Sequence, residues 1–215
     1  MPTLLHLDSS ADLLTSRSRA ITATFADTWR SLGDDHTVVH RDLHRDPLPH
    51  LTDAALHFPP RLRPAGASPS VAQEALQQLL IAELVAADVL LIGVPLYNYS
   101  MPSTLKAWVD YIHLPAVTAP FDDPASQQPL AGRPAVLVST RGGVYDQGTS
   151  TEFDDHALPA LTLILASALG MSVETIVATR TLSERFGAPA DEIAKQHEEL
   201  AAANESATRA ARRLG

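Results

Sequence analysis

The stretch DVLLIGVPLYNYSMPSTLKAWVD, residues 88–110, decides the fold that this sequence predicts. Residues 88–94 are almost wholly apolar and stop at Pro95, which is typical of a strand buried on both faces of a parallel sheet. Residues 102–113 begin with a proline, which is favoured in the first turn of a helix. A buried strand followed by a short loop and a helix indicates a βαβ protein.

The same alternation continues in both directions. We expect further strands at residues 3–7, 37–39 with flanks, 135–139 and 173–179, and further helices at residues 17–32, 70–87, 152–169 and 189–213. The proline-rich segments 47–69 and 115–134 are expected to be loops. Five strands and five helices predict an α/β fold: a doubly wound five-stranded parallel sheet in the order 2-1-3-4-5, with helices on both faces. Residues 1–215 are expected to form one domain.

The composition excludes several classes of protein. The formal net charge of -9 argues against nucleic-acid binding, which needs a concentrated basic surface. The absence of cysteine excludes disulfides, thiolate metal sites and a cysteine nucleophile. No signal peptide is expected, because residues 1–7 are too short for its apolar region, and no apolar run is long enough for a membrane span. We therefore expect a cytoplasmic protein with no membrane partner.

The predicted strand order selects three loops as the place for a ligand. In a 2-1-3-4-5 sheet the order reverses between strands 1 and 3, and ligands bind outside the carboxyl ends of the strands at that point. The loops concerned are residues 8–18, 95–101 and 139–150.

Each loop offers a different kind of contact. The first, DSSADLLTSRSR, places hydroxyls and free N–H groups at a helix N-terminus, where they can bind a phosphate or simply cap the helix. The second, PLYNYSMP, can lie beside a planar ring, although its tyrosines could also be surface aromatics. The third, STRGGVYDQG, has glycines that permit close backbone approach, or form a plain turn. A phosphate site, a ring platform and ring-edge donors together match the three parts of FMN.

Three other functions were weighed. A flavodoxin-type electron carrier shares the expected fold, but the long loops at 47–69 and 115–134 favour a substrate cleft. A hydrolase using Ser9 or Ser10 would need a partner such as His156, yet the GxSxG motif is missing. A metal site formed by His36, His40 and His44 would need a helix, whereas this region is expected to be a strand and a loop, so we expect no metal.

Four motifs carry a family resemblance that spans essentially the whole chain. They are SS at 9–10, SRS at 16–18, PLYNYSMPSTLKAWVD at 95–110 and STRGG at 139–143. In this order and spacing the chain resembles the FMN-dependent NADH:azoreductase and NAD(P)H quinone reductase family, which has a flavodoxin-like fold. The stretch from Tyr97 to Asp110 is the most specific of the four.

The resemblance implies a set of cofactor-binding residues. The phosphate of FMN would contact Ser10, Ser16, Arg17 and Ser18; its ring would contact Leu96, Tyr97, Asn98 and Tyr99; and its pyrimidine edge would contact Thr140, Arg141, Gly142 and Gly143. The resemblance also implies a homodimer with the active sites at the interface, as does a helix at 152–169 that is apolar nearly all round.

The implied reaction is the two-electron reduction of quinones or aromatic azo compounds by NADH or NADPH. Donor and acceptor would use one cleft in turn, which gives ping-pong kinetics, and no side chain would act as a catalytic residue because the flavin carries the chemistry. Phe121 and Tyr145 are the candidate substrate-binding residues. The sequence departs from the family where Ala119 and Pro120 delay an aromatic residue to Phe121, which concerns the acceptor rather than FMN.

Overall fold

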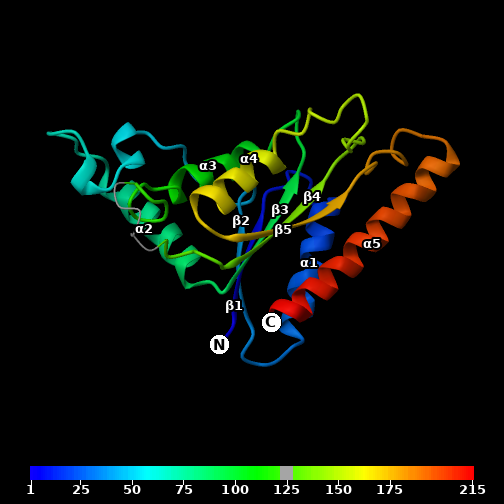
Figure 1. The fold of residues 1–215 in the computed structure, drawn as a ribbon, viewed down its shortest axis with the longest axis horizontal. Helices are drawn as coiled ribbons and strands as arrows, with labels where there is room; N and C mark the ends of the chain where they lie inside the picture. Colours follow the sequence, from blue (N-terminus) through cyan, green and yellow to red (C-terminus); the bar gives the residue numbers. More distant parts are fainter. Residues whose placement is uncertain (122–127) are drawn as a thin grey trace.

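A computed structural model describes residues 1–121 and 128–215. Its centre is one sheet of five parallel strands in the order β2-β1-β3-β4-β5 (Figure 1). The strands are β1 (Thr3–Asp8), β2 (Thr37–Asp42), β3 (Val89–Pro95), β4 (Pro134–Thr140) and β5 (Ser172–Ala178). The predicted fold class and strand order are confirmed.

Strand β3 lies at the middle of the sheet, and every one of its residues is buried. It pairs with β1 on one side and with β4 on the other. Leu90 and Ile92 belong to the apolar core on one face, while Val89 and Leu91 belong to the core on the opposite face. An apolar run without alternation is therefore explained by two covered faces.

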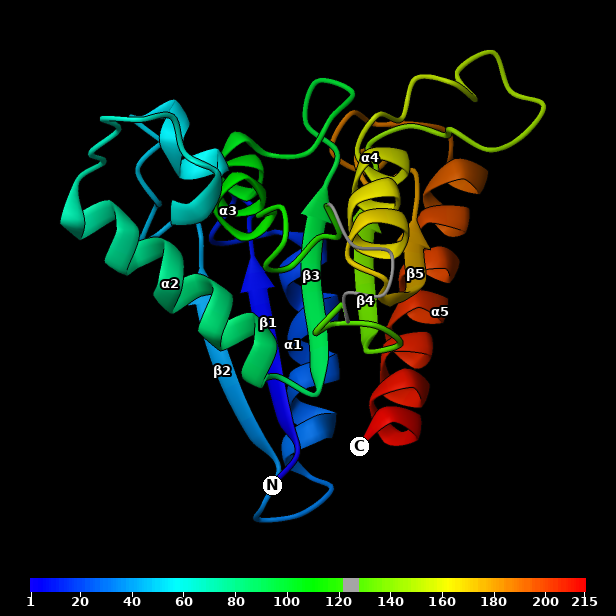
Figure 2. The same ribbon diagram turned by 60° about the vertical axis from the view of Figure 1, so that its left-hand side comes forward.

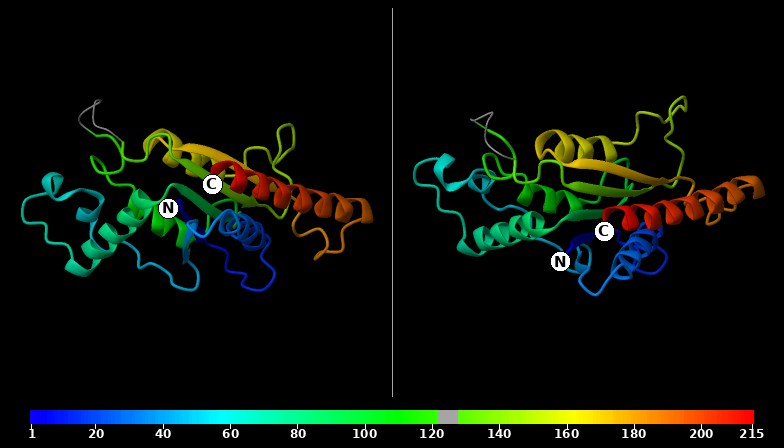
Figure 3. Two further views of the ribbon diagram at one scale, coloured as in Figure 1. Left: turned by 90° about the horizontal axis from the view of Figure 1, so that it is seen from below. Right: turned by 60° about the horizontal axis from the view of Figure 1, so that its bottom comes forward.

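Helices cover both faces of the sheet, as Figure 3 shows in two further views. On one face α1 (Arg17–Arg30) packs beside α5 (Ala190–Leu214), with Phe25 and Trp29 fully buried between helix and sheet. The other face is covered by α2 (Val71–Ala86), α3 (Ser103–Ile112) and α4 (Leu158–Thr162), the last continuing as a π-helix over Leu163–Ala168. No helix in the described part of the chain is both long and apolar enough to cross a bilayer.

Two expectations about the segments outside the sheet need correction. The helix expected at 152–169 begins only at Leu158, because residues 150–153 form turns, and the Asp155 carboxylate accepts the N–H groups of Ala157 and Leu158 at the helix start. The loop expected at 47–69 contains two short 3-10 helices, Ala54–His57 and Pro60–Leu62. Of the loop expected at 115–134, residues 122–127 lie outside the described residues.

The parallel strands bring their carboxyl ends to one edge of the sheet. In Figure 2 the arrowheads of β1, β3 and β5 point to the same end of the molecule, where the loops after β3 and β4 gather. The functional site is built at this end.

Candidate functional site

A cavity of about 670 Å³ opens at the carboxyl ends of β1, β3 and β4. This volume is in the usual range for small-molecule and cofactor sites. Its lining comes from five parts of the chain: Ser10, Asp12, Thr15, Ser16 and Arg17; Pro95, Leu96 and Tyr97; Thr140 and Gly142; Thr181, Leu182, Glu184 and Arg185; and Gln196. The cavity thus lies where the strand order reverses, as the topology predicted.

The N-terminus of α1 forms one end of this cavity. Ser16 is its N-cap, and the Ser16 hydroxyl accepts the N–H of Arg19. The first turn of the helix carries no acidic residue, so its positive dipole end is available to an anion. Asp12 also lines the cavity, but its carboxylate accepts the Thr15 hydroxyl and the N–H groups of Leu14 and Thr15. The hydrogen bond from the Thr15 side chain, followed by the backbone ones, lowers the pKa of Asp12 to about 2.

Arg19 fastens the loop after β1 to the edge strand. Its guanidinium donates two hydrogen bonds to the Asp42 carboxylate, at 2.7 and 2.8 Å, and two to the Ser10 carbonyl. Arg19 therefore fixes the backbone of Ser10. Arg17 lines the cavity instead; its side chain is about half exposed, and its guanidinium lies 3.7 Å from the Glu184 carboxylate.

Residues 97–100 form a tight turn in the second loop. Tyr97 and Ser100 exchange two backbone hydrogen bonds, and Asn98 and Tyr99 both have positive φ, at 47° and 69°, as a type I′ turn requires. The Tyr97 hydroxyl accepts the Ala11 N–H at 3.1 Å and lies 3.1 Å from the Ser10 hydroxyl. The loops after β1 and β3 are thereby joined across the cavity wall.

The third loop approaches the cavity through its backbone. Gly142 lies against Leu182, so closely that a β-carbon at this glycine would be 2.6 Å from the Leu182 Cδ1 atom. Arg141 turns away, because its guanidinium forms a 2.5 Å ion pair with the buried Asp155 and its N–H donates to the Ala178 carbonyl.

Sequence reasoning missed the wall that follows β5. The turn at 181–185 and Gln196 of α5 line the cavity, although only the loops after β1, β3 and β4 were selected. The fully buried Gln196 accepts the Glu184 N–H through its Oε1 at 3.0 Å, which fixes the turn. Its Nε2 has no hydrogen-bond partner among the described residues. The sequence shows a glutamine in the predicted last helix, but it does not show that this side chain is buried or which way it faces.

The structure brings together most of the predicted cofactor-binding residues. Those that line the cavity are Ser10, Ser16, Arg17, Leu96, Tyr97, Thr140 and Gly142. Five others are outside its lining: Ser18, whose buried hydroxyl lies 3.1 Å from that of Ser16, together with Asn98, Tyr99, Arg141 and Gly143.

A second, shallower hollow of about 430 Å³ adjoins the cavity. The two share Leu96, Gly142 and Leu182, and the hollow adds Gly143, Tyr145, Ser183, Phe186 and Ala188. Tyr145, a predicted substrate residue, therefore lies next to the cavity, and burial raises its pKa. Phe121, the other predicted substrate residue, is exposed and lines neither space.

The serines considered for hydrolysis are committed to structural hydrogen bonds. The Ser9 hydroxyl donates to the Gly93 carbonyl at 2.6 Å, and the Ser10 hydroxyl contacts Tyr97. His156, their proposed partner, donates its backbone N–H to the Tyr99 carbonyl. These contacts give no support to a serine nucleophile.

The strand order and the position of the cavity are those of a flavodoxin-like α/β protein, and comparison with known families confirms this class. Residues 2–204 match the family model described as having a flavodoxin-like fold, and the chain belongs to this family.

Curated relatives match it over nearly their whole length. A protein of Kineococcus radiotolerans is 54% identical over 214 residues, covering 100% of this chain and 98% of the relative. One from Frankia alni is 40% identical over 213 residues, covering 98% of each. Both carry the name FMN-dependent NADH:quinone oxidoreductase.

Solved structures share the fold at lower identity. An azoreductase from Bacillus anthracis superposes with a TM-score of 0.79 at 21% identity, covering 98% of this chain and 99% of that one. An FMN-dependent NADH-azoreductase from the same species, in complex with FMN, has a TM-score of 0.77 at 18% identity and covers 98% of this chain and 100% of that one.

Proposed function

We propose that this protein is an FMN-dependent oxidoreductase that passes two electrons from a nicotinamide donor to quinones or aromatic azo compounds. The observation that carries the proposal is the cavity at the strand-order reversal, lined by the three loops that the sequence had indicated. The curated names of the relatives support FMN as cofactor, NADH as donor and quinones as acceptors. Azo compounds are supported by the names of the structural neighbours.

The residues present fit FMN. The N-terminus of α1, with Ser16 and Arg17, offers N–H groups, a hydroxyl and a positive charge to a phosphate. Leu96 and Tyr97 offer a flat apolar wall to a ring, and Gly142 permits close approach of the backbone. Gln196 fixes the turn that follows β5 in this wall, because its Oε1 accepts the Glu184 N–H.

When bound, FMN supplies the redox chemistry itself. The chain's own residues bind and orient it, and no side chain is assigned as acid, base or nucleophile. The adjoining hollow beside Tyr145 and Phe186 offers aromatic contacts to a planar acceptor. Because this hollow shares Leu96, Gly142 and Leu182 with the cavity, donor and acceptor would occupy it in turn, which predicts ping-pong kinetics.

A homodimer is part of the proposal. Phe153 and Leu163 are exposed on or just before the helical segment formed by α4 and the π-helix. A second copy of the chain would cover them, which agrees with the sequence expectation that this segment is buried on more than one side. The cytoplasmic location and the single domain stay predictions from the sequence.

The test is a visible spectrum of the purified chain with FMN, recorded anaerobically before and after NADH and NADPH and again after a benzoquinone. We expect a bound flavin band that bleaches with at least one nicotinamide and recovers with the quinone. A bound flavin that neither nicotinamide reduces would instead favour an electron carrier. Failure to bind FMN would overturn the assignment of the cavity.

A further inference from the structure

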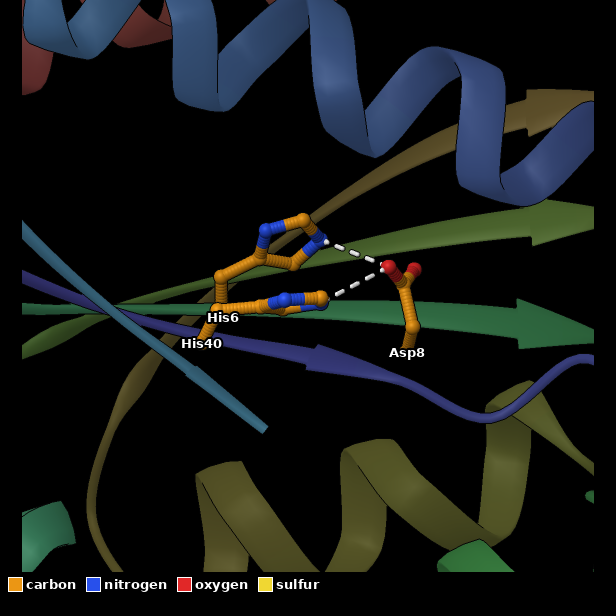
Figure 4. Close-up of side chains that lie close together, drawn as sticks. All are labelled: His6, Asp8 and His40. Atoms are coloured by element: carbon orange, nitrogen blue, oxygen red, sulfur yellow. Dashed lines mark hydrogen bonds and ion pairs between the residues drawn. The ribbon is translucent and has the colours of Figure 1, made fainter. Parts of the chain in front are cut away.

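Two neighbouring strands place three potential metal ligands together on the α1 side of the sheet. His6 and Asp8 lie on β1, and His40 lies opposite His6 in the register of β2. Figure 4 shows both imidazoles pointing toward the Asp8 carboxylate. The two rings are 4.5 Å apart at their centroids. This group is separate from the residues that line the cavity.

We propose that His6, Asp8 and His40 form a binding site for one divalent transition-metal ion of the Zn²⁺ class. The possible ligand atoms, the two imidazole Nε2 atoms and a carboxylate oxygen, all lie within 4.8 Å of one another. Apart from cysteine, the protein ligands of zinc are the imidazole of histidine and the carboxylates of aspartate and glutamate. From the sequence, a metal site of His36, His40 and His44 was not expected; in the structure His40 lies instead beside residues of the adjacent strand.

The spacing of these atoms suits the ion. Asp8 Oδ2 is 3.4 Å from the Nε2 of His6 and 3.0 Å from the Nε2 of His40. Tetrahedral ligands that are each about 2.0–2.1 Å from zinc are separated from one another by about 3.3 Å. Small side-chain rotations would therefore bring the atoms into coordination.

The state of His6 is the observation that favours an ion over a plain hydrogen-bonded group. His6 is 4% exposed, and its Nε2 forms no hydrogen bond of ordinary geometry among the described residues, although it lies 3.4 Å from Asp8 Oδ2. Buried polar atoms left unpaired are uncommon because they lose hydration without compensation. A metal ion between His6 and Asp8 would satisfy this nitrogen.

The surroundings of Asp8 are compatible with this role. The Thr22 hydroxyl donates to the other oxygen, Oδ1, at 2.9 Å, and such outer contacts orient metal-binding carboxylates. Arg19 is the opposing charge, 3.7 Å from Oδ2, and its two hydrogen bonds to Asp42 compensate it.

Access comes from the side of His40. Its side chain is 43% exposed on the edge strand, which leaves room for the ion to enter and for water to complete the coordination. An ion here would tie β1 to β2 just before Ser9 and Ser10, and we assign it a structural role.

The experiment uses the full chain with any affinity tag removed and stripped of metal. Calorimetric titration with Zn²⁺, and visible d–d absorption on titration with Co²⁺, should give one ion per chain. His40→Gln, at a partly exposed position, should weaken binding at least tenfold. The matched control is His44→Gln, which removes a neighbouring histidine outside the group and should leave the affinity unchanged.

A second measurement on the unaltered protein does not depend on any variant folding. Nitrogen-15 spectra of the histidine side chains should show two imidazoles that coordinate Zn²⁺ through Nε2. The proposal is overturned if no ion binds at one per chain, if His40→Gln binds as tightly as the unaltered protein, or if His44→Gln loses binding equally. Coordination by fewer than two imidazoles would overturn it as well.

Discussion

Leu182 occupies the space that a side chain at Gly142 would need: a β-carbon there would lie 2.6 Å from the Leu182 Cδ1 atom. Leu182 lines both the cavity and the adjoining hollow. Gly142→Ala would therefore displace Leu182 toward the space proposed for FMN. We expect the Kd for FMN, measured by flavin fluorescence quenching, to rise about tenfold, which corresponds to about 1.4 kcal/mol.

Gly143 provides the control for this substitution. A β-carbon at Gly143 would lie 3.7 Å from the Tyr145 ring, an ordinary contact distance. Gly143→Ala should leave the Kd for FMN nearly unchanged. Equal weakening by both substitutions would show that the glycines act through loop flexibility and not through Leu182.

Gln196 supports a second prediction, since this fully buried residue holds the turn at 181–185 of the cavity wall through the hydrogen bond that its Oε1 accepts from the Glu184 N–H. Gln196→Met keeps the size of the side chain and removes both hydrogen-bonding groups. The loss of one neutral hydrogen bond of about 1 kcal/mol should raise the Kd for FMN roughly fivefold.

The comparison for Gln196 is Gln77, another buried glutamine. The Gln77 Nε2 donates to the carbonyls of Leu56 and Tyr111, far from the cavity lining. Gln77→Met should lower the Tm and leave the Kd for FMN unaltered. A Gln196→Met variant that lowers only the Tm would assign this residue a purely structural role.

The ion pair of Asp42 with Arg19 predicts a pH dependence of stability. Burial alone would raise the pKa of Asp42, but the hydrogen bonds from Arg19 and from the Arg45 N–H lower it to about 2. Because the folded-state pKa lies below that of the unfolded chain, the stabilisation is complete above about pH 4 and disappears as the pH falls toward 2. At neutral pH it contributes about 2 kcal/mol at most.

Urea denaturation of Asp42→Asn should therefore show a loss of stability at pH 7 that becomes small near pH 2. Asp27→Asn removes an exposed partner of Arg30 and should cost less than about 1 kcal/mol at either pH. A deficit in Asp42→Asn that is as large at pH 2 as at pH 7 would contradict the ion-pair explanation.

The exposed Leu163 on the π-helix gives a test of the proposed dimer. A charge buried without a partner in an apolar interface is strongly unfavourable, so Leu163→Glu should shift the molar mass in light scattering from dimer to monomer. Val71→Glu alters an equally apolar, exposed site at the start of α2 and should not affect assembly. A native protein that is already monomeric would refute the dimer directly.

The centre of the sheet could be predicted because its strands carry apolar runs, and the alternation of strands with helices indicated parallel pairing. Residues 89–94 are an example: burial on two faces leaves a signal that does not depend on distant contacts. The start of α4 could not be predicted this way, since the sequence of residues 152–157 is compatible with a helix, whereas the chain forms turns at 150–153 and the helix begins at Leu158.

The site was predictable as far as it rests on loops named by the topology. Ser16, Tyr97 and Gly142 are in that group and line the cavity. Arg141 belongs to the loop of Gly142, but its side chain forms an ion pair with Asp155 and does not line the cavity. The spacing of residues in the sequence does not reveal this partner. Gln196 and the turn at 181–185 line the cavity because α5 packs against the sheet. This packing joins residues far apart in the sequence, so sequence pattern alone does not predict it.

Tyr99 has a left-handed backbone at φ 69°, a conformation that is costly for a bulky residue, and its ring is more than half exposed. Neither the core nor the cavity lining of this chain uses that ring. Glycine would adopt the same turn without strain, so tyrosine at this position raises the free energy of the folded backbone relative to glycine. Substitution of Tyr99 by glycine would therefore relieve backbone strain at residues 97–100 without removing a side chain from the core or from the cavity lining.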